Sequence, residues 1–169
     1  MIRTSQMKTA VYAFALGFLA LGLGSKAADA TTTTTTTFAV SATVQATCLV
    51  SASPMSFGTY TGAVVNTTST VSVTCTNTTA YNVGLSAGLA SGATVTTRQM
   101  TGPSSAVLGY SLFSDSSRSV NWGSTIGTDT VTGTGNGSSQ ALTVYGQTAA
   151  GQYVTPGSYT DTITATVTY

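Results

Sequence analysis

The stretch Tyr159–Tyr169 reads YTDTITATVTY and decides the fold of this chain. Every second residue in it is threonine, and the residues between the threonines are apolar apart from Asp161. Alternation this strict predicts a β-strand with one face on a hydrophobic core and the other face toward water. The sequence ends on this stretch, so we expect the outer edge of the strand to be unpaired and open to pairing with another chain.

Residues 1–30 have the pattern of a secretory signal peptide. Arg3 and Lys8 supply the positive start, Ala10–Leu23 is an apolar run, and Ala28-Asp29-Ala30 matches a cleavage site between small residues. The alternative is a membrane anchor, but the apolar run is too short to span a bilayer comfortably. We therefore expect export of the chain and cleavage at this site.

Residues 31–169 carry very few charges, and the whole chain contains no histidine. The charged residues of this part are Arg98, Arg118, Asp115, Asp129 and Asp161. Two arginines cannot neutralise the phosphates of a nucleic acid. Without histidine, catalytic triads with an imidazole base and the commonest zinc sites cannot form. We predict that the chain is not an enzyme, binds no nucleic acid and uses no cofactor or metal.

The polar residues are mostly threonine, serine, asparagine and glycine, a composition that favours strands and turns. Alternating apolar residues predict a succession of short strands, separated by turn residues, at 38–50, 55–60, 69–75, 81–85, 95–100, 108–112, 142–146 and 159–169. The segment Ser114–Ser139 is expected to be mostly loop. The pattern predicts an all-β, antiparallel sandwich.

Cys48 and Cys75 are the two cysteines, and both lie in alternating segments of the exported part. A single pair in a secreted chain predicts a disulfide. The alternative is a pair of free thiols for redox or metal chemistry, but a CxxC spacing and histidine are both missing. We expect a structural disulfide.

Two other motifs have both a functional and a structural interpretation. Gly133-Thr134-Gly135-Asn136-Gly137 resembles a phosphate-binding loop, but it lacks the spacing and the following helix of a dinucleotide fingerprint, which favours a surface loop. Trp122 could stack on a sugar, yet an isolated tryptophan is more often packed in a core or turn.

The seven threonines Thr31–Thr37 follow the signal directly. Their lack of apolar residues is typical of a flexible tether. Threonine is also β-branched and favours extended backbone, so the tract could equally be a strand that waits for a partner.

Three segments together resemble the spore coat protein U domain family, which includes the pilins of archaic (Csu-type) chaperone–usher pili. They are Phe38–Tyr60 with the first cysteine, Ser69–Gly88 with the second, and Val154–Tyr169, where Gly-x-Tyr-x-Asp precedes the alternating end. The resemblance implies an incomplete immunoglobulin-like sandwich that lacks its last strand. In such pilins a donor strand from a neighbouring subunit fills the gap by donor-strand exchange.

The resemblance divides the chain into a signal at 1–30, a donor-strand extension at 31–40 and a pilin domain at 41–169. It implies that the extension inserts Thr32, Thr34, Thr36 and Phe38 into a neighbour. The residues expected to form the acceptor groove are Tyr159, Ile163, Ala165, Val167 and Tyr169. Donor strands of the family normally offer several large apolar side chains, whereas this segment offers threonine methyl groups and one phenylalanine. That difference implies another register, or a shallow and partly polar groove.

The function implied by the resemblance is that of a structural subunit of an extracellular fibre, a pilus or fimbria, that serves surface attachment and biofilm formation. Its expected partners are other copies of itself or related pilins, a periplasmic chaperone and an outer-membrane usher. The expected location is the cell surface, after passage through the periplasm. The alternatives are a secreted spore-coat protein and a tip adhesin that binds a ligand through Ser114–Ser139 or Trp122.

Overall fold

The computed structural model describes residues 30–169, so the predicted signal peptide lies almost entirely outside the described residues. The chain divides between Ser41 and Ala42 into two units. In the first unit, residues 30–41 form no helix or strand and are exposed. The second unit, Ala42–Tyr169, contains all of the sheet structure described below. No helix among residues 30–169 has the length and apolar character needed to cross a membrane.

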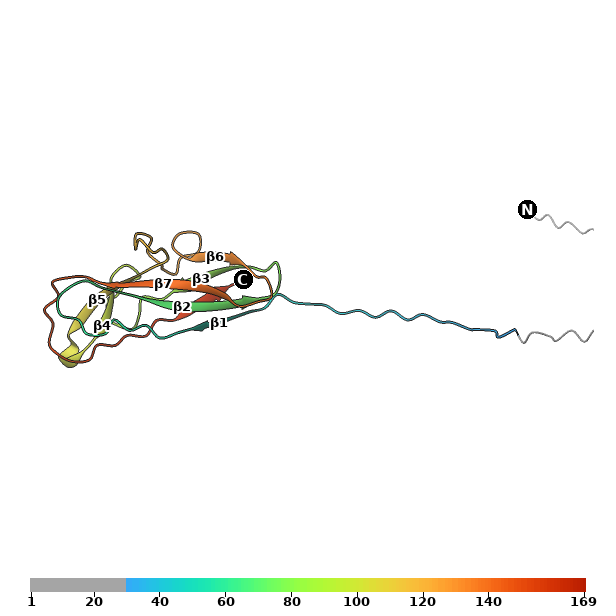
Figure 1. Ribbon diagram of the computed structural model, residues 1–169, viewed down its shortest axis with the longest axis horizontal. Coiled ribbons are helices and arrows are strands. Elements are labelled where there is room, and N and C mark those ends of the chain that lie inside the picture. Colours follow the sequence, from blue (N-terminus) through green and yellow to red (C-terminus); the bar gives the residue numbers. More distant parts are fainter. Residues whose placement is uncertain (1–29) are drawn as a thin grey trace, which may run out of the picture. The chain divides into compact units, whose positions relative to one another are not determined.

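Residues 42–169 form two antiparallel sheets (Figure 1). The larger sheet has the order β1-β2-β7-β5-β4, and the smaller one has the order β6-β3-β8. The strands are β1 (Cys48–Ala52), β2 (Val65–Cys75), β3 (Ala80–Leu85), β4 (Arg98–Thr101), β5 (Val107–Phe113), β6 (Val131–Thr134), β7 (Gln140–Thr148) and β8 (Ala165–Thr168). One 3₁₀ turn, Pro103–Ser105, separates β4 from β5.

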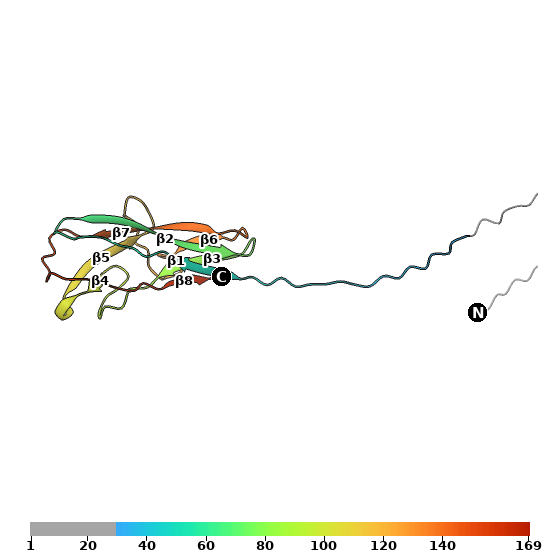
Figure 2. The same cartoon turned by 60° about the horizontal axis from the view of Figure 1, so that its bottom comes forward.

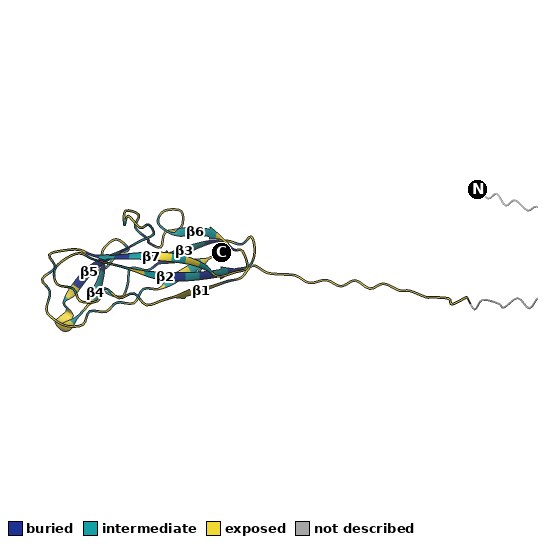
Figure 3. Ribbon diagram, in the orientation of Figure 1, coloured by how far each residue is buried: buried dark blue, intermediate teal, exposed yellow. Residues whose placement is uncertain are grey.

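The core lies between the two sheets and is built from the alternating residues of their inner faces (Figure 3). Each of these strands places every second side chain inside, because successive side chains of a strand point to opposite faces. The buried apolar residues of the strands are Val71, Val73, Cys75, Tyr81, Val83, Leu85, Leu108, Tyr110, Leu112 and Val144. The predicted all-β, antiparallel fold is confirmed.

The Cys48–Cys75 disulfide is present, as predicted. The two cysteines are direct partners in the antiparallel register of β1 and β2. Closing a loop with a sequence separation of 27 residues stabilises the folded chain by about 3–4 kcal/mol in the chain-entropy account. The disulfide therefore fastens the start of β1 to the end of β2.

The extents predicted for several strands were wrong, and three of them differ most. The predicted strand 38–50 begins only at Cys48, residues 55–60 form no strand, and 159–169 is regular strand only in β8. Alternation shows which way side chains face, but ladder hydrogen bonds also require a neighbouring strand. The side chains of 161–167 still alternate between half-buried and exposed. A further difference is β6, which lies inside a segment predicted as loop.

Candidate functional site: an open groove between β1 and β8

The inner face of β1 is only partly covered within residues 42–169. Val50 and Ala52 pair directly with Val73 and Val71 of β2, so their side chains point toward the same face as these core residues. Val73 is fully buried, yet Val50 is 36 % exposed and Ala52 is exposed as well. The sandwich is therefore open on the core side of β1.

The smaller sheet is open at the facing edge, where β8 lies. Ala165 and Val167 pair with Leu85 and Val83, which are buried, but they remain only half-buried themselves. Figure 2 shows β1 and β8 next to each other, one from each sheet. Both are edge strands, and each therefore leaves N–H and C=O groups unpaired along one edge.

A groove of about 1180 Å³ runs along this open side. One wall is Ala52–Gly62, and the other contains Gln152–Ile163 and Ala165. Its floor is the core itself, because it is lined by buried residues that include Val71, Leu85, Leu112 and Val144. The volume exceeds that of ordinary small-molecule sites. Its volume and apolar floor suit an extended peptide.

Asp161 supplies the one carboxylate that lines the groove. It accepts hydrogen bonds from the Tyr110 hydroxyl at 2.7 Å and from the Leu89 backbone N–H at 2.7 Å. Burial, and then the hydrogen bond to Asp161, raise the pKa of Tyr110. Gly88 has a φ of +92° and lies so close to this carboxylate that a Cβ there would collide with it. The groove thus has an apolar floor, walls that include serine and threonine, and one internally paired acidic position.

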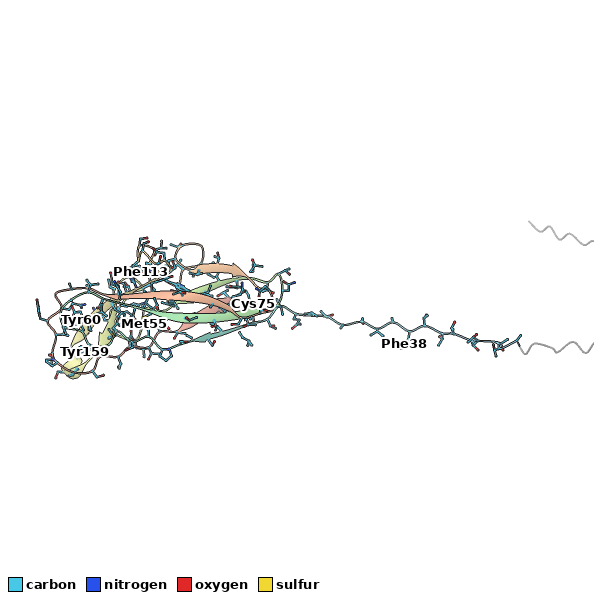
Figure 4. All side chains as sticks on the ribbon, in the orientation of Figure 1. Phe38, Met55, Tyr60, Cys75, Phe113 and Tyr159 are labelled. Atoms are coloured by element: carbon cyan, nitrogen blue, oxygen red, sulfur yellow. A yellow bond between two sulfur atoms is a disulfide. The ribbon has the colours of Figure 1, made fainter. Side chains whose placement is uncertain are left out.

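At one end of the groove, side-chain hydrogen bonds link the segment after β7 to the rest of the domain. The Gln152 amide accepts from the Gly109 N–H at 2.7 Å and donates to the Gly109 carbonyl at 2.9 Å. The Tyr60 hydroxyl donates to the Ala149 carbonyl at 2.7 Å. Figure 4 places Tyr60 and Tyr159 at the end of the domain opposite to Cys75. These bonds hold both walls to the sandwich at this end.

The predicted acceptor residues fall into two groups. Tyr159, Ile163 and Ala165 line the groove. Val167 packs against the core further along β8, and Tyr169 is 57 % exposed; neither lines the groove. The predicted donor residues Thr32, Thr34, Thr36 and Phe38 are exposed in the first unit.

The wall Ala52–Gly62 was not predicted as part of the site. Met55 and Phe57 of this wall pack against the core, and they also fill the space over Gly146, which has no side chain. Their alternation with serine and glycine was the available signal. This alternation indicated a strand, but residues 55–60 pair with no neighbouring strand among residues 30–169.

The other candidate sites have structural roles. Trp122 is buried and donates its indole N–H to the Val83 carbonyl at 2.8 Å. The glycine-rich stretch forms the end of β6 and the turn into β7. Asp115 accepts hydrogen bonds from Ser117, Val120 and Ser119, which lower the pKa of its carboxyl group. No group of three potential metal ligands occurs within residues 30–169.

The domain is thus an all-β sandwich with an open groove along one side. Residues 34–166 match the Spore Coat Protein U domain, and the chain belongs to this family. It is 35 % identical to Protein U of Myxococcus xanthus over 128 residues, which cover 68 % of this chain and 71 % of that protein.

A solved structure with a similar fold is the CsuC–CsuE chaperone–tip adhesion subunit pre-assembly complex from archaic chaperone–usher Csu pili of Acinetobacter baumannii. The TM-score is 0.53 at 25 % identity, and the match covers 75 % of this chain and 40 % of the matched chain. The present chain thus spans less than half of that relative. The family and the matched complex are structural, which confirms the prediction that the chain is not an enzyme.

Proposed function

We propose that this chain is a structural subunit of a cell-surface pilus, in which the N-terminal segment of one copy fills the groove of the next. The observation that carries the proposal is the groove, whose floor is the hydrophobic core and whose walls are the segments that follow β1 and precede β8. An added strand would satisfy the open edges of β1 and β8 and cover the exposed core residues. The likeness to a subunit from chaperone–usher pili supports this function.

The same proposal names the partners. A free subunit with an open core would aggregate during export, so a periplasmic chaperone covers the groove until an outer-membrane usher exchanges it for the next subunit. Donation from one copy to the next is a heterologous contact that need not close into a ring, and it therefore produces a filament. The fibre would serve surface attachment and biofilm formation.

The test is electron microscopy of producing cells in which the groove is blocked. Ala165→Arg places a long charged side chain in the groove, whereas Thr166→Arg places it on the exposed face of the same strand. We expect fibres to be lost with Ala165→Arg and retained with Thr166→Arg. Deletion of residues 31–45 should also abolish fibres, and fibres that persist after this deletion would refute the proposal.

A second candidate is a spore-coat subunit, which is favoured by the match to the Spore Coat Protein U domain and to Protein U. The same groove would then link copies within a surface layer. Immunogold labelling distinguishes the two, since a pilus subunit is labelled along fibres and a coat subunit over the spore surface.

A further inference from the structure

The residues between the threonine tract and β1 form a second apolar pattern that is fully exposed. Phe38, Val40 and Val44 are 84 %, 83 % and 85 % exposed, and Ala42 between them is exposed as well. All four occupy even positions, so in an extended segment they lie on one face. A row of exposed apolar side chains on one face indicates a surface that is covered by a partner.

The attachment of this segment to the domain begins at Thr47. Its carbonyl accepts from the Thr76 N–H at 3.0 Å, and its own N–H donates to the Thr76 hydroxyl at 3.2 Å. Cys48 follows with the disulfide to Cys75. Residues up to Ala46 are therefore free to pair elsewhere, and the four apolar residues all precede this point.

We propose that the inserted strand comprises residues 37–45, with Phe38, Val40, Ala42 and Val44 in the groove of a second copy and the threonines Thr31–Thr36 outside it. This inference rests on the proposed function and specifies its register. Burying a hydroxyl group without a partner is unfavourable, whereas burying a valine or phenylalanine side chain stabilises the buried state. The apolar register is favoured over one that inserts Thr32, Thr34 and Thr36.

The faces of the two strands match in this register. The core-facing side of the acceptor strand offers Ile163 and Ala165 in the groove and Val167 beyond it, while its outer face offers the threonines from 162 to 168. The even residues 38–44 would meet the apolar side. The outer residues Thr37, Ser41 and Thr43 would lie beside the outer threonines, and hydroxyl pairs of this kind stabilise adjacent strands.

The direction of insertion requires a second copy. The start of β1 lies beside the end of β2, because Cys48 pairs with Cys75. The end of β8 lies beside the start of β3, because Thr168 pairs with Asn82. A short turn joins β2 to β3, so the start of β1 and the end of β8 lie at the same end of the domain. Antiparallel pairing with β8 puts Val44 near Asp161, about 23 Å from that end. The link from Val44 to Thr47 spans at most about 10 Å. A chain cannot fill its own groove in this direction.

The experiment compares single aspartate variants of the full chain, produced in cells that assemble the fibre. Val44→Asp tests the proposed register, Thr43→Asp is its matched control on the outer face, and Thr34→Asp tests the alternative register. The amount of fibre sheared from cells is measured against the amount of exported subunit. All three positions are exposed, so none of the changes disturbs the fold.

We expect Val44→Asp to reduce the fibre at least tenfold, and Thr43→Asp and Thr34→Asp to leave it within about twofold of the unchanged chain. Loss with Thr34→Asp but not with Val44→Asp would overturn the register and leave the proposed function standing. Equal loss with Val44→Asp and Thr43→Asp would overturn the assignment of faces. If deletion of residues 31–45 leaves fibres intact, the register and the proposed function both fail.

Discussion

Arg98 is buried in the core although it is charged, and it is only 1 % exposed. Burial lowers the pKa of its guanidinium group. The group donates hydrogen bonds to four backbone carbonyls, those of Leu85, Ser86, Val95 and Trp122. These carbonyls belong to the end of β3 and to two loops, so one side chain holds three segments together. The sequence did not indicate this role, because arginine is usually exposed.

Replacing Arg98 by methionine should lower the free energy of unfolding by about 3 kcal/mol, since several buried carbonyls lose their donor. Urea unfolding of the oxidised protein measures the change. Arg118→Met is the control: Arg118 lies 5.8 Å from the centre of the Tyr145 ring and makes only long hydrogen bonds. We expect that variant to lose less than about 1 kcal/mol. Equal losses would contradict the role assigned to Arg98.

The ionisation of Tyr110 makes the free energy of unfolding depend on pH in the alkaline range. Its pKa is raised in the folded protein by burial and by the bond to Asp161, while in the unfolded chain it is about 10. The raised pKa stabilises the folded state at pH values below the pKa of Tyr110 in the unfolded chain. This contribution declines as the pH rises above that pKa. The unfolding free energy should therefore fall by up to about 1.4 kcal/mol per pH unit above about pH 10.

Urea unfolding between pH 8 and pH 11 checks this expectation. Tyr110→Phe should remove most of the slope, whereas Tyr153→Phe, at a side chain that is 93 % exposed, should leave it unchanged. The same slope in both variants would show that other groups are responsible.

At the scale of elements, alternation predicted the strands that are covered on their inner face. The apolar residues of β2, β3, β5 and β7 were placed correctly because each strand has a partner in the chain and a core to face. The extents of β1 and β8 could not be predicted in this way. The alternation continues before both strands, but residues 38–47 form no strand and the residues just before β8 line the groove.

The groove was only partly predictable for the same reason. Ile163 and Ala165 were recognisable from the alternation of the last stretch, and both line the groove. The contribution of Gln152 depends on its bonds to Gly109, 43 residues away in the sequence. Long-range contacts of this kind leave no periodic pattern.

Loss of the disulfide should affect β1 most. Changing both Cys48 and Cys75 to serine removes about 3–4 kcal/mol of chain-entropy stabilisation, and it frees an edge strand whose residues are largely exposed. Hydrogen exchange should show lost protection in β1 while β5 and β7 stay protected. Uniform loss of protection would mean that the disulfide supports the whole sandwich.

At the scale of the whole molecule, a subunit with an open core should be much less stable alone than when its groove is filled. A synthetic peptide of residues 36–46, added to the chain lacking residues 31–45, should raise the unfolding free energy by about 2.7 kcal/mol at a hundred times its dissociation constant. Thermal unfolding with increasing peptide measures this.

The control peptide carries aspartate at positions 40 and 44. It should leave the melting temperature unchanged, because charged side chains are not tolerated on an apolar floor without partners. A shift of equal size with both peptides would indicate binding elsewhere on the domain.

The position of the disulfide has a mechanical consequence for the proposed fibre. When such a fibre is pulled, tension enters each copy through residues 45–47 and reaches Cys48 first. The covalent link passes the load directly to β2, which pairs with strands on both sides, so the hydrogen bonds of β1 are spared. The inserted strand is loaded along its own length, and its hydrogen bonds to the neighbour resist together. In the proposed fibre, the disulfide and the inserted strand would together let the thread withstand the pull of flow.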